Sequence, residues 1–227
     1  MKLRSSILAI LTMLMLLSVC SSPVVKHIPN NMEQNPPISI YIDLWNNELH
    51  LLQQNRLIET FKIAPGKDDT PTPVGHFKVI TKSKNWGSGF GTRWLGLDVP
   101  WGIYGIHGTN KPSLIGQNVS AGCVRMHNED VERLYELVPI GTEVHIDGPL
   151  SGRSEVDEFP PLAVGSRGSI VQLVQNRLQL AGYYDGPNDG IYGKYMELAV
   201  KEFQRNAGLP ITGYLTQRDY LLLGLME

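Results

Sequence analysis

Apolar and polar residues alternate strictly over residues 38–44, where four apolar side chains are separated by three more polar ones. A period of two residues is the pattern of a β-strand with one buried face. Asn46-Asn47 follows, and Asn tolerates the positive φ of a tight hairpin turn. Further apolar runs predict returning strands at 49–52, 57–64, 75–81 and 143–146. This part of the chain is therefore predicted to be mainly β and sandwich-like.

One short helix interrupts this β pattern. Asn128 is a candidate N-cap because Glu129 and Asp130 follow it, and acidic residues suit the positive end of a helix. We expect the helix to run to about Val138, before a proline and a glycine. Two loops rich in glycine or proline, 65–73 and 84–93, are of the kind that borders functional sites.

Beyond residue 162 the apolar residues recur at helical spacing. Ser169 with Gln172 predicts a capping box, and Gly182 ends the first helix. A second helix stops at Gly208, and Thr216 begins a third with Asp219 as its capping partner. The C-terminal part is therefore predicted to be a small all-α domain of three helices.

The N-terminus has the composition of an export signal. Lys2 and Arg4 precede the apolar run 7–19, which is short for a membrane span and suits a signal peptide better than a core helix. The run leads into Leu-Ser-Val-Cys, which resembles a bacterial lipobox with Val19 in place of the usual small residue. Lipidation of Cys20, ordinary cleavage and a retained anchor all remain open, and each implies export to the cell envelope.

These patterns divide the chain into five parts. We expect an export peptide over 1–20, a tether over 21–37, a first domain over 38–148, an acidic and proline-containing linker over 149–162, and a second domain over 163–227.

Charge argues against a nucleic-acid partner. The 227 residues include 20 basic and 22 acidic side chains, a formal net charge of −2, and removing Lys2 and Arg4 with the signal leaves 18 against 22, or −4. A mildly acidic protein without a basic stripe does not attract phosphates. With 42% apolar and 19% charged residues, the composition is that of an ordinary globular protein.

The cysteines are more informative. The chain has two, Cys20 and Cys123. If the signal interpretation is right, Cys20 is either lipidated or removed with the signal peptide. An exported protein then keeps one thiol without a disulfide partner, in a compartment where thiols are usually paired. The alternative is a buried cysteine that acts as a small apolar side chain.

The surroundings of Cys123 suit a nucleophile. His107 lies sixteen residues before it and can take the thiol proton, because only the thiolate attacks. Gly122 permits close approach of a substrate, and the backbone N–H groups of 122–124 can stabilise an oxyanion. Arg125 adds a cation that lowers the thiol pKa or holds a carboxylate. By itself a His and Cys pair is a weak signal.

The whole pattern is more specific. The segments HGT at 107–109, SAGCVRM at 120–126 and TPVGHF at 72–77 resemble the L,D-transpeptidase catalytic domain, also called the YkuD domain, over residues 38–148. The resemblance implies that Cys123 is the nucleophile and His107 the base. It also implies that the Gly108 carbonyl orients the imidazole, that Ser120 supports the site, and that Arg125 binds substrate or organises the site.

In that family the cysteine attacks a tetrapeptide stem of peptidoglycan after its third residue and releases D-alanine. The thioester then passes to an amine of another stem, which forms a 3→3 cross-link and contributes to cell wall organisation and cell shape. Many members have His before the Gly-Cys pair, whereas this chain has Ala121, so His107 would serve both half-reactions. No cofactor is implied, and His127 with His107 lacks the third ligand that zinc prefers, so no metal is expected.

The C-terminal segment resembles a three-helix peptidoglycan-binding domain in its GYY, DGIYG, AVKEFQ, GLP and TG segments. The resemblance implies binding to the wall. Tyr183, Tyr184 and Tyr192 are candidates to stack on sugars, or are core residues.

Three other functions stay open. An L,D-carboxypeptidase would let water resolve the same acyl-enzyme, and a non-enzymatic wall-binding lipoprotein would fit a buried Cys123. A cysteine endopeptidase of the wall-hydrolase type fits less well, because it places Cys before His. The expected partners are peptidoglycan stem peptides and glycan, with membrane contact only through the N-terminus, and the expected state is a monomer.

Overall fold

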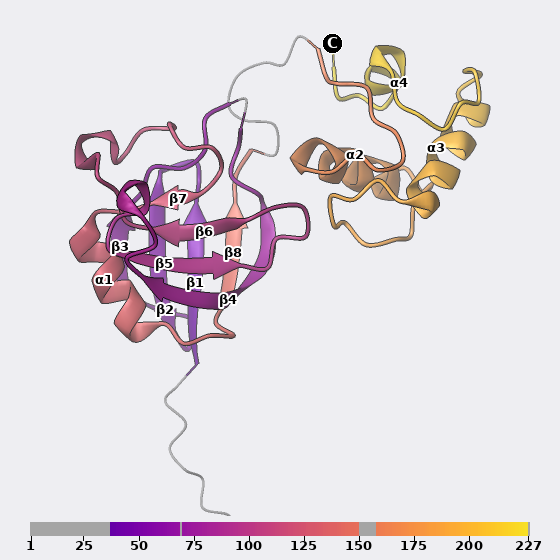
Figure 1. Ribbon diagram of the computed structural model, residues 1–227. Helices are drawn as coiled ribbons and strands as arrows, with labels where there is room; N and C mark the ends of the chain where they lie inside the picture. The colour runs from indigo at the N-terminus through magenta and orange to yellow at the C-terminus, as the bar shows by residue number, and fades with distance from the viewer. Residues whose placement is uncertain (1–36, 69, 150–157, 227) are drawn as a thin grey trace, which may run out of the picture. The chain divides into compact units, whose positions relative to one another are not determined.

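The computed structural model describes residues 37–68, 70–149 and 158–226 (Figure 1). The predicted export peptide, the lipidation at Cys20 and nearly all of the tether lie outside the described residues, as does the middle of the linker. Within the described ranges, no helix is both long enough and apolar enough to cross a membrane.

Eight strands form one sheet in the order β3-β2-β1-β8-β4-β5-β6-β7. The strands are β1 (Ile38–Asp43), β2 (Glu48–Gln53), β3 (Arg56–Lys62), β4 (Gly75–Lys84), β5 (Arg93–Leu97), β6 (Tyr104–His107), β7 (Val124–Arg125) and β8 (Glu143–Asp147). Most neighbours are antiparallel, but β1 pairs with β8 and β6 pairs with β7 in parallel. The predicted hairpin turn is present, with Asn47 at φ 55°.

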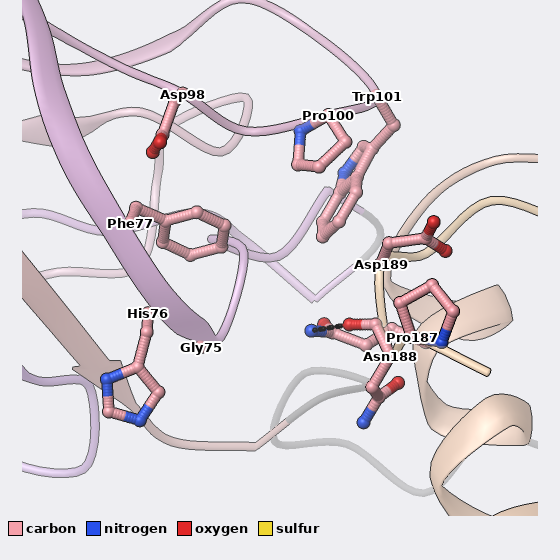
Figure 2. A pocket seen from close by; sticks show the side chains of 10 residues that line it. Gly75, His76, Phe77, Asp98, Pro100, Trp101, Pro187, Asn188 and Asp189 are labelled. Atoms are coloured by element: carbon pink, nitrogen blue, oxygen red, sulfur yellow. Dashed lines mark hydrogen bonds between the residues drawn. The ribbon is translucent and has the colours of Figure 1, made fainter. Parts of the chain in front are cut away.

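The long strand β4 joins the two halves of the sheet. Its first residues pair with β8, its later residues pair with β5, and the register shifts between Val79 and Thr81. His76 is exposed and Phe77 is buried, so the strand alternates between a solvent face and a core face. Phe77 meets Trp101 edge to face with ring centroids 6.4 Å apart (Figure 2).

One apolar core lies between the two halves. Ile40, Leu49 and Val144 come from the first half, and Leu95 and Ile106 come from the second. Two layers of strands that share a core make the predicted mainly-β, sandwich-like domain, which is confirmed. Strands β5, β6 and β7 were not predicted as separate elements, because they are short and rich in glycine or turn residues.

Helix α1 (Asn128–Leu137) packs on β5 and β6 and buries Val131 and Leu134. The predicted N-cap is displaced by one residue: His127 occupies the cap position and Asn128 is the first residue of the helix. The Asn128 side chain accepts hydrogen bonds from two loops instead of capping its own helix.

The C-terminal part consists of α2 (Ser169–Leu180), α3 (Lys194–Asn206) and α4 (Gln217–Leu222), as predicted. The capping box of Thr216 and Asp219 is confirmed. The capping box at Ser169 is wrong, because Gly168 holds the cap position without a side-chain bond. Gln172 donates instead to the Asn188 carbonyl at 3.3 Å, across the turn drawn in Figure 2.

Two of the three candidate sugar-stacking tyrosines belong to the helical core. Tyr184 is 6% exposed and Tyr192 is 1% exposed, and the Tyr192 hydroxyl donates to the Gly213 carbonyl. Tyr183 is half-buried against Phe203. The stacking interpretation is therefore wrong for Tyr184 and Tyr192. This helical core and the β core have no residue in common.

Candidate active site

The parallel pair β6 and β7 brings the two sequence motifs together. Ile106 lies opposite Val124, His107 lies opposite Arg125, and the Met126 N–H donates to the His107 carbonyl at 2.8 Å. Successive side chains of a strand point to opposite faces. Ile106 and Val124 enter the core, so His107 and Arg125 share the other face.

Cys123 comes directly before β7, in line with Gly105 on β6. Since side chains alternate along the strand, the Cys123 thiol lies on the same face of the sheet as the side chains of Arg125 and His107. A Cβ on Gly105 would lie 2.6 Å from the Leu95 carbonyl oxygen and 2.7 Å from the Trp94 ring. The position admits only glycine, and the Gly105 backbone forms a hydrogen bond with the unpaired, half-buried thiol.

The orientation of His107 is fixed by the next residue. Its Nδ1 lies 2.6 Å from the Gly108 carbonyl oxygen, and the ring is 3% exposed. A carbonyl oxygen only accepts, so Nδ1 carries the proton in this contact. The neutral imidazole then has its lone pair on Nε2, which is the tautomer that a base needs.

An aromatic cluster, Trp86, Phe90 and Trp94, surrounds the imidazole. Trp94 stacks on His107 at 5.6 Å and Phe90 meets it edge-on at 4.9 Å. Trp86 covers Trp94 at a centroid distance of 4.0 Å. Trp86 and Phe90 lie in the glycine-rich loop 84–93 that the sequence placed beside a site, and Phe90 ends the short 3₁₀ turn Ser88–Phe90.

Burial sets the protonation of both candidate groups. It lowers the pKa of His107 to about 4, and the Arg125 charge lowers it further, whereas hydrogen bonds to the backbone of Gly108 and Phe90 favour the charged form. Burial also raises the pKa of the Cys123 thiol, although the Gly105 hydrogen bond and Arg125 act in the opposite direction. At neutral pH both shifts favour the neutral form of the group.

Ser120 holds the turn that carries the thiol. Its hydroxyl donates to the Cys123 carbonyl and accepts from the Gly122 N–H at 3.0 Å. Its own N–H donates to the Pro65 carbonyl at 3.0 Å, which ties the turn to the proline-rich loop. Because the Gly122 N–H is bonded to Ser120 and Val124 pairs with β6, neither the Gly122 nor the Val124 N–H is open as the oxyanion donor expected over 122–124.

Gly122 and Arg125 complete the turn. Gly122 has φ +107°, and a Cβ there would lie 2.6 Å from the Tyr104 ring, so glycine is required for both conformation and space. Arg125 exchanges backbone hydrogen bonds with Ala64, at 3.0 and 2.8 Å. Its charge acts on both His107 and Cys123.

Sequence reasoning missed the roles of Tyr104, Asn128 and the aromatic cluster. Tyr104 is adjacent to the histidine motif, but nothing in its spacing shows that the ring covers Gly122.

His127 and Asn128 line a hollow of about 360 Å³ beside the loop at Thr109. Among the described residues, no group of three or more His, Cys, Asp or Glu side chains is arranged to hold a metal ion.

Comparison with known proteins agrees with this geometry. Residues 37–146 match the model of the L,D-transpeptidase catalytic domain, YkuD, and residues 167–218 match that of a peptidoglycan binding domain. The first match contains both Cys123 and His107.

The curated relatives carry the same family name. The L,D-transpeptidase YkuD of Bacillus licheniformis is 47% identical over 110 residues, which are 48% of this chain and 66% of the relative. The Bacillus subtilis YkuD is 46% identical over 111 residues, 49% of this chain and 66% of the relative. The L,D-transpeptidase YqjB of Bacillus subtilis is 38% identical over 122 residues, 47% of this chain and 69% of the relative.

The matched region thus spans about two thirds of the length of these relatives, and the helical part is matched separately. The family model, the relatives and the juxtaposed histidine and cysteine motifs agree, and the chain belongs to the L,D-transpeptidase family.

Proposed function

We propose that the protein is a peptidoglycan L,D-transpeptidase in which Cys123 is the nucleophile and His107 is the base. The observation that carries the proposal is the parallel register of β6 and β7, which puts both side chains on one face. The bond from His107 Nδ1 to the Gly108 oxygen leaves Nε2 as the basic nitrogen. A thiol and an imidazole on one face of the sheet suit acyl transfer through a thioester.

In the first half-reaction the Cys123 thiol gives its proton to His107 Nε2 as Sγ attacks the carbonyl carbon of the third stem residue. The carbon–nitrogen bond then breaks, the leaving D-alanine amine takes the proton from His107, and a thioester remains. A pKa of about 4 keeps the imidazole of His107 in its neutral, proton-accepting form at neutral pH.

In the second half-reaction an amine of another stem attacks the thioester carbon and loses a proton to His107. The carbon–sulfur bond breaks, the thiol is restored, and a 3→3 cross-link forms. Ala121 offers no second proton carrier next to the thiol. We infer that the same imidazole serves both half-reactions.

The remaining parts of the chain fit an enzyme of the cell envelope. We infer that the helical part binds peptidoglycan, as the name of the matching family states. We further propose that the protein is exported through its N-terminal signal, and that Cys20 is the site of lipidation if the signal is of the lipoprotein type. The mass of the mature N-terminus tests this last step.

The decisive experiment incubates the full mature chain with purified tetrapeptide muropeptides and determines the products by mass. We expect free D-alanine and dimers whose mass equals that of two monomers minus one molecule of free D-alanine. Monomers that lack D-alanine would instead identify a carboxypeptidase, because water has then resolved the acyl-enzyme. Neither product from folded wild-type protein would refute both activities, and Cys123→Ala is the control.

A carbapenem provides an independent test of the nucleophile. We expect folded wild-type protein to gain the mass of one carbapenem at Cys123 and His107→Ala to be labelled much more slowly. Labelling at the rate of unfolded protein would argue for a non-enzymatic wall-binding protein.

A further inference from the structure

The peptide group between Gly108 and Thr109 is hydrogen-bonded at both ends. Its carbonyl oxygen, that of Gly108, lies 2.6 Å from His107 Nδ1. Its N–H, that of Thr109, donates to Asn128 Oδ1 at 3.1 Å. A single planar amide therefore connects the imidazole to the side chain of Asn128.

Asn128 Oδ1 accepts a second backbone bond. The Thr92 N–H donates to it at 3.3 Å. One oxygen thus joins the start of α1, the loop after β6 and the end of the loop that carries Trp86 and Phe90.

Two glycines enclose this oxygen. A Cβ on Gly91 would lie 2.1 Å from Asn128 Oδ1, and a Cβ on Gly108 would lie 2.2 Å from it. Gly91 also has φ +63°, which favours glycine. Since a real Cβ fits neither position, the approach of the two backbones to the amide oxygen depends on the absence of side chains at both glycines.

We propose that Asn128 is a positioning residue that controls His107 through the Gly108–Thr109 peptide. This inference rests on the proposed function, in which His107 is the base. Hydrogen bonds in a chain polarise one another, so an acceptor on the Thr109 N–H makes the Gly108 carbonyl a stronger acceptor. The stronger acceptor holds the proton on Nδ1 and keeps Nε2 basic.

The helix itself does not need this side chain. His127 holds the cap position of α1, and the Val131 N–H donates to the His127 carbonyl at 3.0 Å. The only side-chain bonds that Asn128 forms within the described part of the chain are those from Thr92 and Thr109. A neutral amide also adds no charge beside the imidazole, whereas an aspartate there would favour its protonated form.

The test compares three variants of the full chain. Asn128→Leu keeps the approximate shape and removes the acceptor, Asn128→Asp keeps an acceptor and adds a charge, and Val131→Ala weakens the same helix without touching the amide. One readout is the tautomer of His107 from ¹⁵N resonances of the imidazole. The other is the rate of Cys123 acylation by a carbapenem, per folded molecule.

We expect Asn128→Leu to slow acylation by roughly tenfold to a hundredfold, a part of the ~10²–10⁴-fold that a positioned general base contributes. Its His107 should show a mixture of tautomers. Asn128→Asp should stay within about threefold of wild type and shift the acid limb of the pH profile upward. Val131→Ala should match wild type in both readouts.

Two results would overturn the proposal: a wild-type tautomer and rate in Asn128→Leu, or an equal loss in Val131→Ala. If Asn128→Leu does not fold, Asn128→Ala takes its place in the same comparison. If the wild-type protein is not acylated at all, the proposed function fails, while the tautomer measurement still decides the role of Asn128.

Discussion

The β domain and the helical domain both use a side-chain amide to hold glycine-containing backbone. In the helical domain, Gln204 Oε1 accepts from the N–H groups of Thr212 and Gly213 at 3.0 and 2.9 Å. Its Nε2 donates to the Tyr214 carbonyl and the Asp219 carboxylate, both at 2.9 Å. In the β domain, Asn128 Oδ1 accepts from two backbone N–H groups in the same manner.

The two amides differ in what lies beyond the backbone that they hold. The Gln204 network ends in a turn and a helix cap, so it contributes stability alone. The Asn128 network continues through one peptide to His107. If the Asn128 amide acts through this peptide, variants of the two domains should separate stability from reactivity.

The largest difference between the domains should appear when the reacting groups themselves are removed. Cys123→Ala should abolish cross-linking, and His107→Ala should reduce it by about 10³-fold or more, because nucleophile and base are lost. Muropeptide turnover measures this. Binding of the full chain to isolated peptidoglycan should be unchanged in both variants, and weaker binding would contradict the separation.

Gln204→Leu should have the opposite profile. It leaves the buried Gly213 N–H without its acceptor, which costs ~1–3 kcal/mol, whereas water can replace the acceptor of the exposed Thr212 N–H, so we expect about 2 kcal/mol less stability. Denaturant unfolding of the helical domain measures the loss. The carbapenem labelling rate of Cys123 should stay at the wild-type value, since the two cores have no residue in common. A parallel fall in labelling would show that the domains are coupled.

The pH dependence of stability should isolate the buried imidazole. His107 has its pKa lowered from 6.5 to about 4, so the unfolded chain binds a proton that the folded chain does not bind between these values. The free energy of unfolding should then fall as the pH falls from 6.5 to 4, by about 3 kcal/mol in total. Comparing denaturant unfolding of wild type with His107→Gln isolates this part, and equal slopes would refute the assignment.

The candidate nucleophile Cys123 and the candidate base His107 could be named from the sequence because each stands in a short motif. The sequence did not predict how they meet, since β7 has only two residues and no periodicity reveals so short a strand. Asn128 was interpreted as a helix cap because acidic residues follow it. Local sequence cannot show that the backbone at Gly91 and Gly108, both distant in the chain, lies close to the side-chain oxygen of Asn128.

The burial of single aromatic residues could not be predicted from the sequence either. The mainly-β and three-helix architecture followed from periodicity, which depends on many residues at once. Tyr184 and Tyr192 lie among turn residues, where no period indicates which face is inside, and both proved to be core residues. Single aromatic residues in turns are thus poor candidates for ligand contacts until packing is known.

The smallest effect should come from the exposed rim of the aromatic cluster. Trp86 is 43% exposed, but it covers Trp94, which in turn stacks on His107. Trp86→Ala should let water closer to the imidazole and raise the pKa of His107 by about 0.5, because desolvation is the main cause of its low value. An NMR titration of the imidazole measures the shift. Trp45→Ala removes another exposed tryptophan, on the turn after β1, and should leave that pKa unchanged. An equal shift in both variants would show that the aromatic cluster does not set the pKa of His107. A shift in Trp86→Ala alone would show that the surface loop 84–93 contributes to the low pKa of this imidazole.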